Sequence, residues 1–389
     1  MRTRVLCIVM LLAVLSFAFP YPVCADEISA DARGAVLMDA GSGTVLFEQD
    51  AHEKLYPASV TKIMTALLVM ESMESGKISL EDQVVISANA AGMGGSQIYM
   101  EPEEVKTVEQ LMKAIVVASG NDASVALAEH TAGTVDAFVQ LMNQRAEELG
   151  MVNTNFVNPH GLHDENHYTS AYDVALMSRE LVKHSKIFDW STIWMEDILV
   201  GKEGRFSTFT MVNTNKLLRR YEGVDGLKTG STDAAKYCLS ATAVKGNMRL
   251  IAVLMGCPTS ETRFKEAEKL LNFGFTKYNS VPITSKEDVI DKLRVNKGVE
   301  RWVSVKPEGD LKVLVLKGQE SSLQKETVLL PEITAPVAEG DKLGELIVRQ
   351  EGEILSTVDL VAEKAIDKAG LIKILKRVLA DWLAPAEYQ

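Results

Sequence analysis

The chain reads YPASVTKIMT at residues 56–65, and this stretch opens a helix that we predict over Ser59–Met73. The predicted helix is apolar nearly all round, which places it in the middle of a domain rather than on its surface. Ser59 and Lys62 lie three residues apart, so a helix brings the hydroxyl and the amine onto one face, within reach of each other. The sequence therefore predicts a central helix that carries a serine beside a lysine.

A serine and a lysine in this arrangement can form a nucleophile and its base. The Ser59 hydroxyl attacks a carbonyl effectively only if a base removes its proton. A neutral Lys62 amine can do so, although the ordinary lysine pKa is about 10.4. Burial, the positive end of the helix and a second cation would each lower that pKa. Alone the motif is weak, because an N-capping serine followed by a surface lysine has the same spacing.

A second motif, Ser119-Gly120-Asn121, separates two predicted helices. A serine and an asparagine two residues apart across a turn can both point into one cleft. The alternative is simple capping of the second helix.

A third motif, Lys228-Thr229-Gly230, follows a glycine-containing stretch and precedes Ser231. Lys228 supplies a positive charge, and Thr229 and Ser231 supply hydroxyl groups for an anionic ligand. Gly230 lacks a side chain, so a strand edge there can lie close against a substrate backbone. The alternative is an exposed lysine in a glycine-rich turn.

Predicted strands lie at both ends of this region, with helices between them. We expect strands over residues 35–39, 44–48, 237–244 and 248–256, and helices over 59–73, 108–119, 121–132, 135–149, 170–183 and 261–273. This order predicts an α+β fold in which helices flank an antiparallel sheet whose strands come from both ends of the chain.

The three motifs together form a known signature. Ser-x-x-Lys, a Ser-x-Asn element and Lys-Thr-Gly, in this order, are typical of β-lactamases and penicillin-binding proteins. Here they begin at residues 59, 119 and 228. The chain closely resembles the serine D-alanyl-D-alanine carboxypeptidases, the low-molecular-mass penicillin-binding proteins of peptidase family S11. The resemblance rests on YPASVTKIMT (56–65), ASGNDA (118–123), NPHGL (158–162) and DGLKTG (225–230), and it implies a β-lactamase/transpeptidase-like domain.

The resemblance also implies an acyl-enzyme mechanism. Ser59 would attack the bond between the two terminal D-alanines of a peptidoglycan stem peptide, with Lys62 taking its proton. Ser119 would relay a proton toward the leaving nitrogen, and Asn121 would hold Lys62 and the substrate amide. β-Lactams would acylate Ser59 because they mimic the D-Ala-D-Ala end. No cofactor is implied.

Substrate binding is assigned by the same resemblance to the third motif. Lys228, with Thr229 and Ser231, would bind the terminal carboxylate of the peptide. Gly230 would leave room along the strand. The backbone N–H groups of Ser59 and Ser231 would form the oxyanion hole, which contributes several kcal/mol in such enzymes.

Length and composition favour several domains and an exported protein. The chain has 389 residues, and its formal charge of −12 argues against nucleic-acid binding. Residues 1–25 have a basic start, an apolar run and small residues before Asp26, so we predict a signal peptide. An uncleaved membrane anchor is the alternative. We expect the catalytic domain over 26–278 and a small all-β domain over 279–362, broken by glycine, proline and charged turns.

The last segment, residues 363–389, is predicted to be an amphipathic helix. Its apolar stripe is Ile366, Leu371, Ile374, Leu375, Val378, Leu379, Trp382 and Leu383. Five Lys and Arg residues against two Asp residues give it a charge of +3 over 364–383. A basic amphipathic helix with a tryptophan near its end suits a membrane surface, here the outer face of the cytoplasmic membrane. A helix docked on its own β domain or on a partner is the alternative.

Two other residue groups are given structural interpretations. Cys238 and Cys257 flank a predicted hairpin, and buried free thiols are favoured over a disulfide. His160, His163 and His167 have a spacing that matches no zinc site, so no metal is expected.

Two rival functions are weighed against the carboxypeptidase. A β-lactamase would need a Glu-x-x-Leu-Asn element between the second and third motifs, which the sequence lacks. A scaffold with a decayed site would not retain every motif residue.

Overall fold

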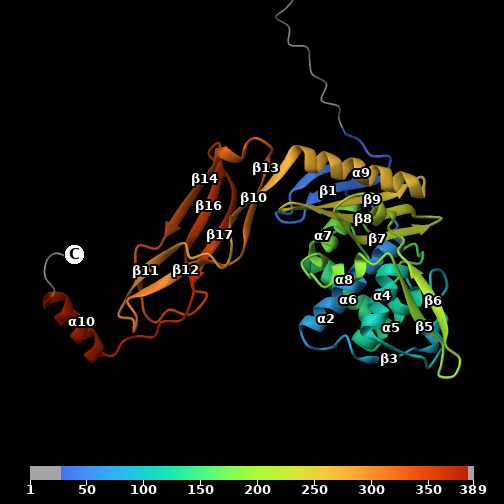
Figure 1. Ribbon diagram of the computed structural model, residues 1–389, viewed down its shortest axis with the longest axis horizontal. Helices are drawn as coiled ribbons and strands as arrows, with labels where there is room; N and C mark the ends of the chain where they lie inside the picture. Colours follow the sequence, from blue (N-terminus) through green and yellow to red (C-terminus); the bar gives the residue numbers. More distant parts are fainter. Residues whose placement is uncertain (1–27, 384–389) are drawn as a thin grey trace, which may run out of the picture. The chain divides into compact units, whose positions relative to one another are not determined.

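The computed structural model describes residues 28–383, and the predicted signal segment over residues 1–25 lies outside them. The first domain is built on a five-stranded sheet in the order β2-β1-β9-β8-β7, with every neighbouring pair antiparallel (Figure 1). The strands are β1 (Gly34–Asp39), β2 (Val45–Gln49), β7 (Val224–Thr232), β8 (Lys236–Lys245) and β9 (Met248–Cys257). The predicted antiparallel sheet, with strands from both ends of the region, is confirmed.

Helices cover both faces of this sheet. In Figure 1, α9 lies on one side of the sheet and the remaining helices of the domain lie on the other. The helices are α2 (Lys62–Glu74), α3 (Ala88–Ala91), α4 (Val108–Lys113), α5 (Asn121–Ala132), α6 (Val135–Glu148), α7 (Ala171–Leu181), α8 (Ile187–Ser191) and α9 (Ser260–Lys277). Two small two-stranded sheets complete the domain, β3 (Gln83–Val85) with β4 (Val105–Thr107) and β5 (Met195–Val200) with β6 (Ser207–Val212). Between β6 and β7 lies a 3₁₀ turn, η3 (Lys216–Arg219).

The central helix is buried as the sequence predicts. A 3₁₀ turn, η1 (Ala58–Thr61), leads into α2, and every α2 residue from Lys62 to Met70 is buried. Surrounding helices and the sheet therefore enclose α2 for more than two turns. Ser59 sits on the entry turn rather than in the α-helix itself.

The predicted helix over residues 108–119 is instead split. After α4 the chain forms a wider π turn, η2 (Ala114–Ala118), and Ser119 then adopts a left-handed conformation with φ +61°. The N–H of Gly120 donates back to the carbonyl of Ala114, which closes the widened turn. This ending lets α5 begin at Asn121, directly after the turn. Wide turns of this kind are frequent at functional sites.

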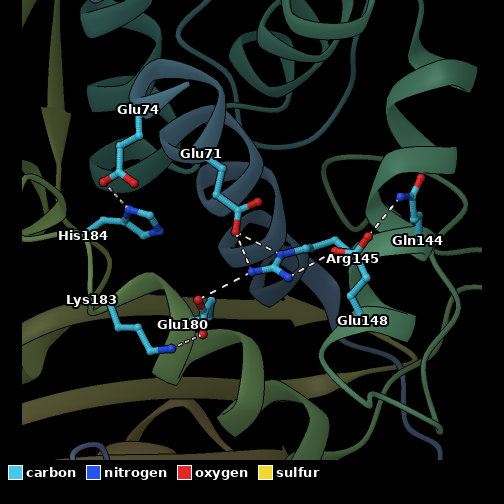
Figure 2. Close-up of polar contacts among 8 residues, drawn as sticks. All are labelled: Glu71, Glu74, Gln144, Arg145, Glu148, Glu180, Lys183 and His184. Carbon is cyan, nitrogen blue, oxygen red and sulfur yellow. Dashed lines mark hydrogen bonds and ion pairs between the residues drawn. The ribbon is translucent and has the colours of Figure 1, made fainter. Parts of the chain in front are cut away.

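A charged cluster ties α2 to α6 and α7 (Figure 2). Arg145 on α6 forms ion pairs with Glu71 on α2 at 2.8 Å, with Glu148 at 3.1 Å and with Glu180 on α7 at 3.5 Å. Lys183 pairs with Glu180 at 2.6 Å. Because one guanidinium contacts carboxylates from three helices, the cluster fixes the far end of the central helix against its neighbours.

The two cysteines of the described chain are both buried and both free, as predicted. The Cys238 thiol donates to the carbonyl of Ala235, with sulfur and oxygen 3.5 Å apart. Burial raises the pKa of Cys238 to about 11 and that of Cys257 to about 12. Both side chains are therefore neutral thiols and serve as small apolar residues in the core.

The second domain is all-β and has its own core. It contains a six-stranded sheet in the order β14-β16-β17-β12-β11-β15 and a two-stranded sheet of β10 and β13. The strands are β10 (Tyr278–Thr284), β11 (Asp291–Asn296), β12 (Trp302–Pro307), β13 (Leu311–Leu316), β14 (Leu323–Leu329), β15 (Ile333–Thr334), β16 (Lys342–Gln350) and β17 (Glu353–Ala362), with a short 3₁₀ turn, η4 (Glu320–Ser322). Valine, leucine and isoleucine side chains from these strands form a separate apolar cluster. The predicted all-β fold of this segment is confirmed.

The last helix, α10 (Leu371–Leu383), is shorter than predicted. Ile366, which we placed on its apolar stripe, is 1% exposed and belongs to the core of the β domain. It is held there by paired backbone hydrogen bonds with Val337, so residues before the helix continue the β domain. Sequence periodicity alone could not separate this buried residue from the helical stripe. No helix within residues 28–383 is long and apolar enough to cross a bilayer.

Candidate active site

The three sequence motifs come from different elements of the first domain. Ser59 lies on η1 and Lys62 opens α2. Ser119 and Asn121 lie at the junction of η2 and α5. Residues 228–231 lie on β7, which the structure makes a strand rather than an exposed glycine-rich turn. Lys62 and Lys228 line the same small cavity, together with apolar side chains from α2, η2 and α8.

Lys62 is the centre of the site. Its side chain is 1% exposed, and its Nζ atom lies 3.2 Å from Ser59 Oγ, 2.7 Å from Asn121 Oδ1 and 2.8 Å from the carbonyl oxygen of His160. Burial lowers the pKa of Lys62 well below its ordinary value; Lys228 lowers it further, while Asp122 acts in the opposite direction. The environment therefore favours an uncharged amine.

The contacts of an uncharged Lys62 fix the direction of its lone pair. A neutral amine has two N–H groups and one lone pair. The side-chain oxygen of Asn121 and the carbonyl oxygen of His160 can only accept hydrogen bonds. They therefore take the two N–H groups, which directs the lone pair at the Ser59 hydroxyl.

The orientation of Asn121 is set by its other contacts. Its Nδ2 donates to the carbonyl of Gly94 at 2.7 Å, so Oδ1 must be the atom that faces Lys62. Its backbone N–H donates to the carbonyl of Ser96 at 2.7 Å. A Cβ atom on Gly95, which has φ +77°, would lie 2.8 Å from Asn121 Nδ2. The 94–96 loop therefore requires a glycine at this position beside Asn121.

Ser119 lies at the site but its hydroxyl is unengaged. The residue is 4% exposed, and within the described chain its Oγ atom has no hydrogen-bond partner. The left-handed backbone at this residue carries strain for a side chain other than glycine. A buried hydroxyl without a partner is uncommon in folded proteins, so Ser119 stands out among the residues near Asn121.

Lys228 is a second buried amine. It is 4% exposed, and its Nζ donates to the carbonyl of Thr229 at 3.1 Å. Burial, with a smaller effect of Arg263, lowers the pKa of Lys228 to about 7. Near neutral pH this amine is therefore poised between its two charge states, and an anionic ligand would favour the charged one.

Gly230 is required for a closer contact than the sequence predicts. A Cβ atom there would lie 2.8 Å from the carbonyl oxygen of Pro57 and 2.9 Å from the backbone nitrogen of Ser59. We expected the missing side chain to make room for a substrate. In the structure it makes room for the turn that carries Ser59, so β7 and η1 lie in direct backbone contact.

The turn over residues 158–162 is a positioning element of the site. Asn158 Oδ1 accepts hydrogen bonds from the N–H of His160 at 3.2 Å and of Gly161 at 2.6 Å. These bonds shape a turn whose carbonyls face α2: His160 accepts from Lys62, and Pro159 accepts from Thr65 at 2.6 Å. Gly161 has φ +87°, and a Cβ atom there would lie 1.9 Å from the carbonyl oxygen of Ala58.

The buried histidines of this region are engaged with the protein itself. His167 Nδ1 accepts from the N–H of Val157 at 3.0 Å, so its Nε2–H donates to Thr61 Oγ1 at 2.8 Å. Burial lowers the pKa of His167 to about 4 and that of His160 to about 3, so both rings are neutral at physiological pH. Among residues 28–383 no group of three His, Cys, Asp or Glu side chains is placed to hold a metal ion.

Comparison with known proteins agrees with this geometry. The family model described as D-alanyl-D-alanine carboxypeptidase matches residues 22–259, more than half of the chain. The chain belongs to this carboxypeptidase family. A second model, the C-terminal domain of penicillin-binding protein 5, matches residues 278–368. The predicted family and enzyme class are thereby confirmed, and a β-lactamase alternative does not account for the second domain.

Individual relatives of this carboxypeptidase span nearly its full length. The chain is 43% identical to the D-alanyl-D-alanine carboxypeptidase DacF of Bacillus subtilis over 92% of this chain and 91% of the relative. It is 35% identical to the D-alanyl-D-alanine carboxypeptidase DacC of Escherichia coli, over 91% of this chain and 88% of the relative. Among solved structures, penicillin-binding protein 5 from Haemophilus influenzae superposes with a TM-score of 0.74 at 32% identity, over 88% of this chain and all of that chain.

One residue of the carboxypeptidase site was missed by sequence reasoning. Arg263 on α9 is 7% exposed, and its guanidinium donates to the carbonyls of Gly230 at 3.0 Å and Cys238 at 3.3 Å. It therefore holds β7 and β8 at the level of the third motif and adds a positive charge behind Lys228. The available signal was an arginine on a helix face otherwise made of buried residues such as Phe264 and Ala267.

Proposed function

We propose that this carboxypeptidase cleaves the terminal D-Ala-D-Ala bond of peptidoglycan stem peptides through an ester at Ser59, trimming pentapeptides to tetrapeptides. One observation carries the proposal: the buried Lys62 Nζ lies 3.2 Å from Ser59 Oγ, while Asn121 Oδ1 and the His160 carbonyl lie within 2.8 Å of it and accept its N–H groups. A base in this position is what a serine nucleophile requires. The names of the relatives supply the substrate class.

Acylation begins with transfer of the Ser59 proton to Lys62 as Oγ attacks the carbonyl carbon of the penultimate D-alanine. The negative charge that develops on the carbonyl oxygen is stabilised by the backbone N–H groups of Ser59 and Ser231. Support comes from Gly230: a Cβ atom there would lie 2.9 Å from the Ser59 nitrogen, so the backbones of β7 and of the Ser59 turn are close together. One such donor contributes about 3–4 kcal/mol to the stability of the transition state.

Departure of D-alanine requires a proton on its nitrogen. The Ser119 hydroxyl has no partner within the described chain and passes this proton on from Lys62. Asn121 keeps Lys62 oriented during the transfer, since its amide is itself fixed by Gly94. Water then hydrolyses the Ser59 ester and releases the shortened peptide. β-Lactams acylate Ser59 by the same first step.

The free carboxylate of the terminal D-alanine is bound by Lys228, Thr229 and Ser231. Lys228 supplies the charge, and burial of its amine makes that charge strong in a site of low dielectric. The Thr229 hydroxyl donates to Thr214 Oγ1 at 2.6 Å, so it must turn away from that bond to donate to the carboxylate, whereas Ser231 is exposed next to it. A site that binds a terminal carboxylate removes residues only from the end of a peptide.

The proposal is tested by D-alanine release from diacetyl-Lys-D-Ala-D-Ala and by labelling with a fluorescent penicillin. Both are expected in the intact protein, and both should disappear in Ser59→Ala while the fold is retained. Failure of the intact protein to be labelled or to release D-alanine would overturn the proposal. Rapid, repeated turnover of nitrocefin would instead indicate a β-lactamase.

The pH dependence of kcat/KM should depend on two lysines with opposite requirements. Lys62 must be neutral, so activity rises with pH as its lowered pKa is passed. Lys228 must be charged, so activity falls as pH rises above its pKa of about 7. Lys228→Arg keeps the charge to much higher pH and should move the falling limb upward. An unchanged falling limb in this variant would exclude Lys228 as its origin.

We further propose that the chain is exported by the signal peptide over residues 1–25 and acts at the outer face of the cytoplasmic membrane. In this proposal residues 26–278 carry the catalysis, residues 279–362 form the β domain, and the segment 363–389 associates with the membrane surface. The apolar side chains of α10 support this: Leu371, Ile372, Leu375, Val378 and Leu379 are each at least half exposed. Exposed apolar side chains beside cationic ones are typical of a helix that lies in a membrane interface.

Removal of α10 should release the protein from membranes without loss of activity on soluble peptides. The truncation should end at Gly370, because Ile366 belongs to the core of the β domain and its loss would destabilise that domain. Sedimentation with vesicles measures the binding, and D-alanine release measures the activity. A truncated protein that still sediments with vesicles would show that another segment makes the attachment.

A further inference from the structure

A basic hollow lies between α10 and the β domain. It is open to solvent, has a volume of about 460 Å³, and is lined by Arg294, Lys297, Arg301 and Arg377 together with Ile374 and Val378. Its remaining lining residues, Val295 and Asn296, are uncharged. Four cationic side chains therefore converge in a chain whose overall charge is −12.

Among the described side chains of α10, Arg377 attaches the helix beside this hollow. Arg377 Nη1 donates to the carbonyl of Gly298 at 2.7 Å, and its Nη2 donates to the carbonyl of Val299 at 2.5 Å. Both acceptors are neutral, so the charge of Arg377 is not balanced there. The helix is thus attached to the segment between β11 and β12 by hydrogen bonds that leave a net positive charge.

Two of the four cations of the hollow have no counter-charge in the described chain. Within the described chain, the side chains of Arg294 and Lys297 have no ion-pair or hydrogen-bond partner, whereas Glu300 is already paired with Lys364 at 2.6 Å and Glu332 accepts from Asn296 at 2.8 Å. Arg294 and Lys297 are both exposed. Two free cations beside the charge of Arg377 form a site that is complementary to a phosphate group.

The elements that form the hollow also expose apolar side chains. Trp302 pairs directly with Arg294 across β11 and β12 and is 54% exposed. Leu371 and Ile372 at the start of α10 are 82% and 75% exposed. Tryptophan and cationic side chains together are enriched at the level of lipid headgroups, with apolar side chains below them. A soluble anion would leave this apolar surface in water, whereas a bilayer would cover it.

We propose that the hollow lined by Arg294, Lys297, Arg301 and Arg377 binds the phosphate of an anionic phospholipid. The β domain would then contact the bilayer directly, with Trp302 at headgroup depth, while α10 inserts its apolar side chains. This inference rests on the proposed membrane association and adds to it a preference for anionic lipids. In this proposal the β domain itself binds a lipid headgroup.

The test compares binding of the full chain to vesicles of phosphatidylcholine alone and to vesicles that also contain phosphatidylglycerol. Binding to the anionic vesicles should be stronger, and the double variant Arg294→Gln, Lys297→Gln should lose roughly tenfold to thirtyfold of affinity for them. Its binding to neutral vesicles should be unchanged. The matched control Lys286→Gln, Lys312→Gln removes the same charge from exposed positions on the same domain outside the hollow, and should lose less than threefold.

Three outcomes would overturn the inference. Equal binding of the intact protein to neutral and anionic vesicles would leave membrane association standing but exclude the headgroup site. Equal loss in the two double variants would show general charge attraction instead of a site. Absence of binding to any vesicle would overturn the membrane association as well. D-Alanine release, which should be unchanged in all variants, reports that each is folded.

Discussion

Lys62→Ala is expected to slow acylation by a fluorescent penicillin roughly 10³-fold or more, because it removes the base from Ser59. The fold should be retained, since the substitution takes an expensive buried amine out of the core. Labelling rate and D-alanine release measure the effect, and circular dichroism reports the fold. Lys77→Ala, at an exposed position just beyond α2, is the control and should react normally.

Lys62→Arg separates the loss of the base from the loss of the side chain. Arginine keeps a long side chain with donor groups but stays protonated, so it cannot accept the Ser59 proton. It should therefore be almost as slow as the alanine variant. Labelling of either variant within tenfold of the intact protein would remove Lys62 from the base role.

Gly161→Ala is expected to reduce kcat/KM by about 10²-fold or more. Its Cβ would lie 1.9 Å from the carbonyl oxygen of Ala58, so the 158–162 turn or the turn carrying Ser59 must move. Either movement breaks the alignment of the His160 carbonyl, Lys62 and the nucleophile. A displacement of about 1 Å at a catalytic site costs a factor of this size.

Gly150→Ala provides a matched control for the backbone conformation. Gly150 also has a positive φ, +73°, but a Cβ atom there would have no neighbour within 4 Å. Both variants carry the strain of a left-handed alanine, about 1–2 kcal/mol. Only Gly161→Ala adds the collision, so Gly150→Ala should keep kcat/KM within twofold. Comparable activity losses in the two variants would show that backbone strain, and not the collision, is responsible.

The features that depend on the types of side chain could be predicted from the sequence. The order of the three motifs predicts the family, and the apolar run after Lys62 predicts the buried central helix. Both predictions rest on the identity of side chains, which the sequence states directly. The predicted strands at both ends of the region, with helices between them, predict the antiparallel sheet.

The parts that could not be predicted depend on backbone atoms and tertiary contacts. The second acceptor for Lys62 is the carbonyl of His160, and every residue has a carbonyl, so no residue type marks this role. The π turn before Ser119 changes hydrogen-bond spacing without any characteristic residue. Ile366 fits the helical stripe by spacing, and only packing within the β domain decides its place.

The reactivity of the two buried thiols depends on whether the enzyme is folded. Oxidants and alkylating reagents react with the thiolate, and the raised pKa values of Cys238 and Cys257 keep that form scarce while the fold is intact. An oxidising medium should therefore leave the native enzyme unmodified. A maleimide would react with these thiols only when the sheet opens. The labelling rate would therefore measure how often β8, the strand next to the third motif, separates from its neighbours.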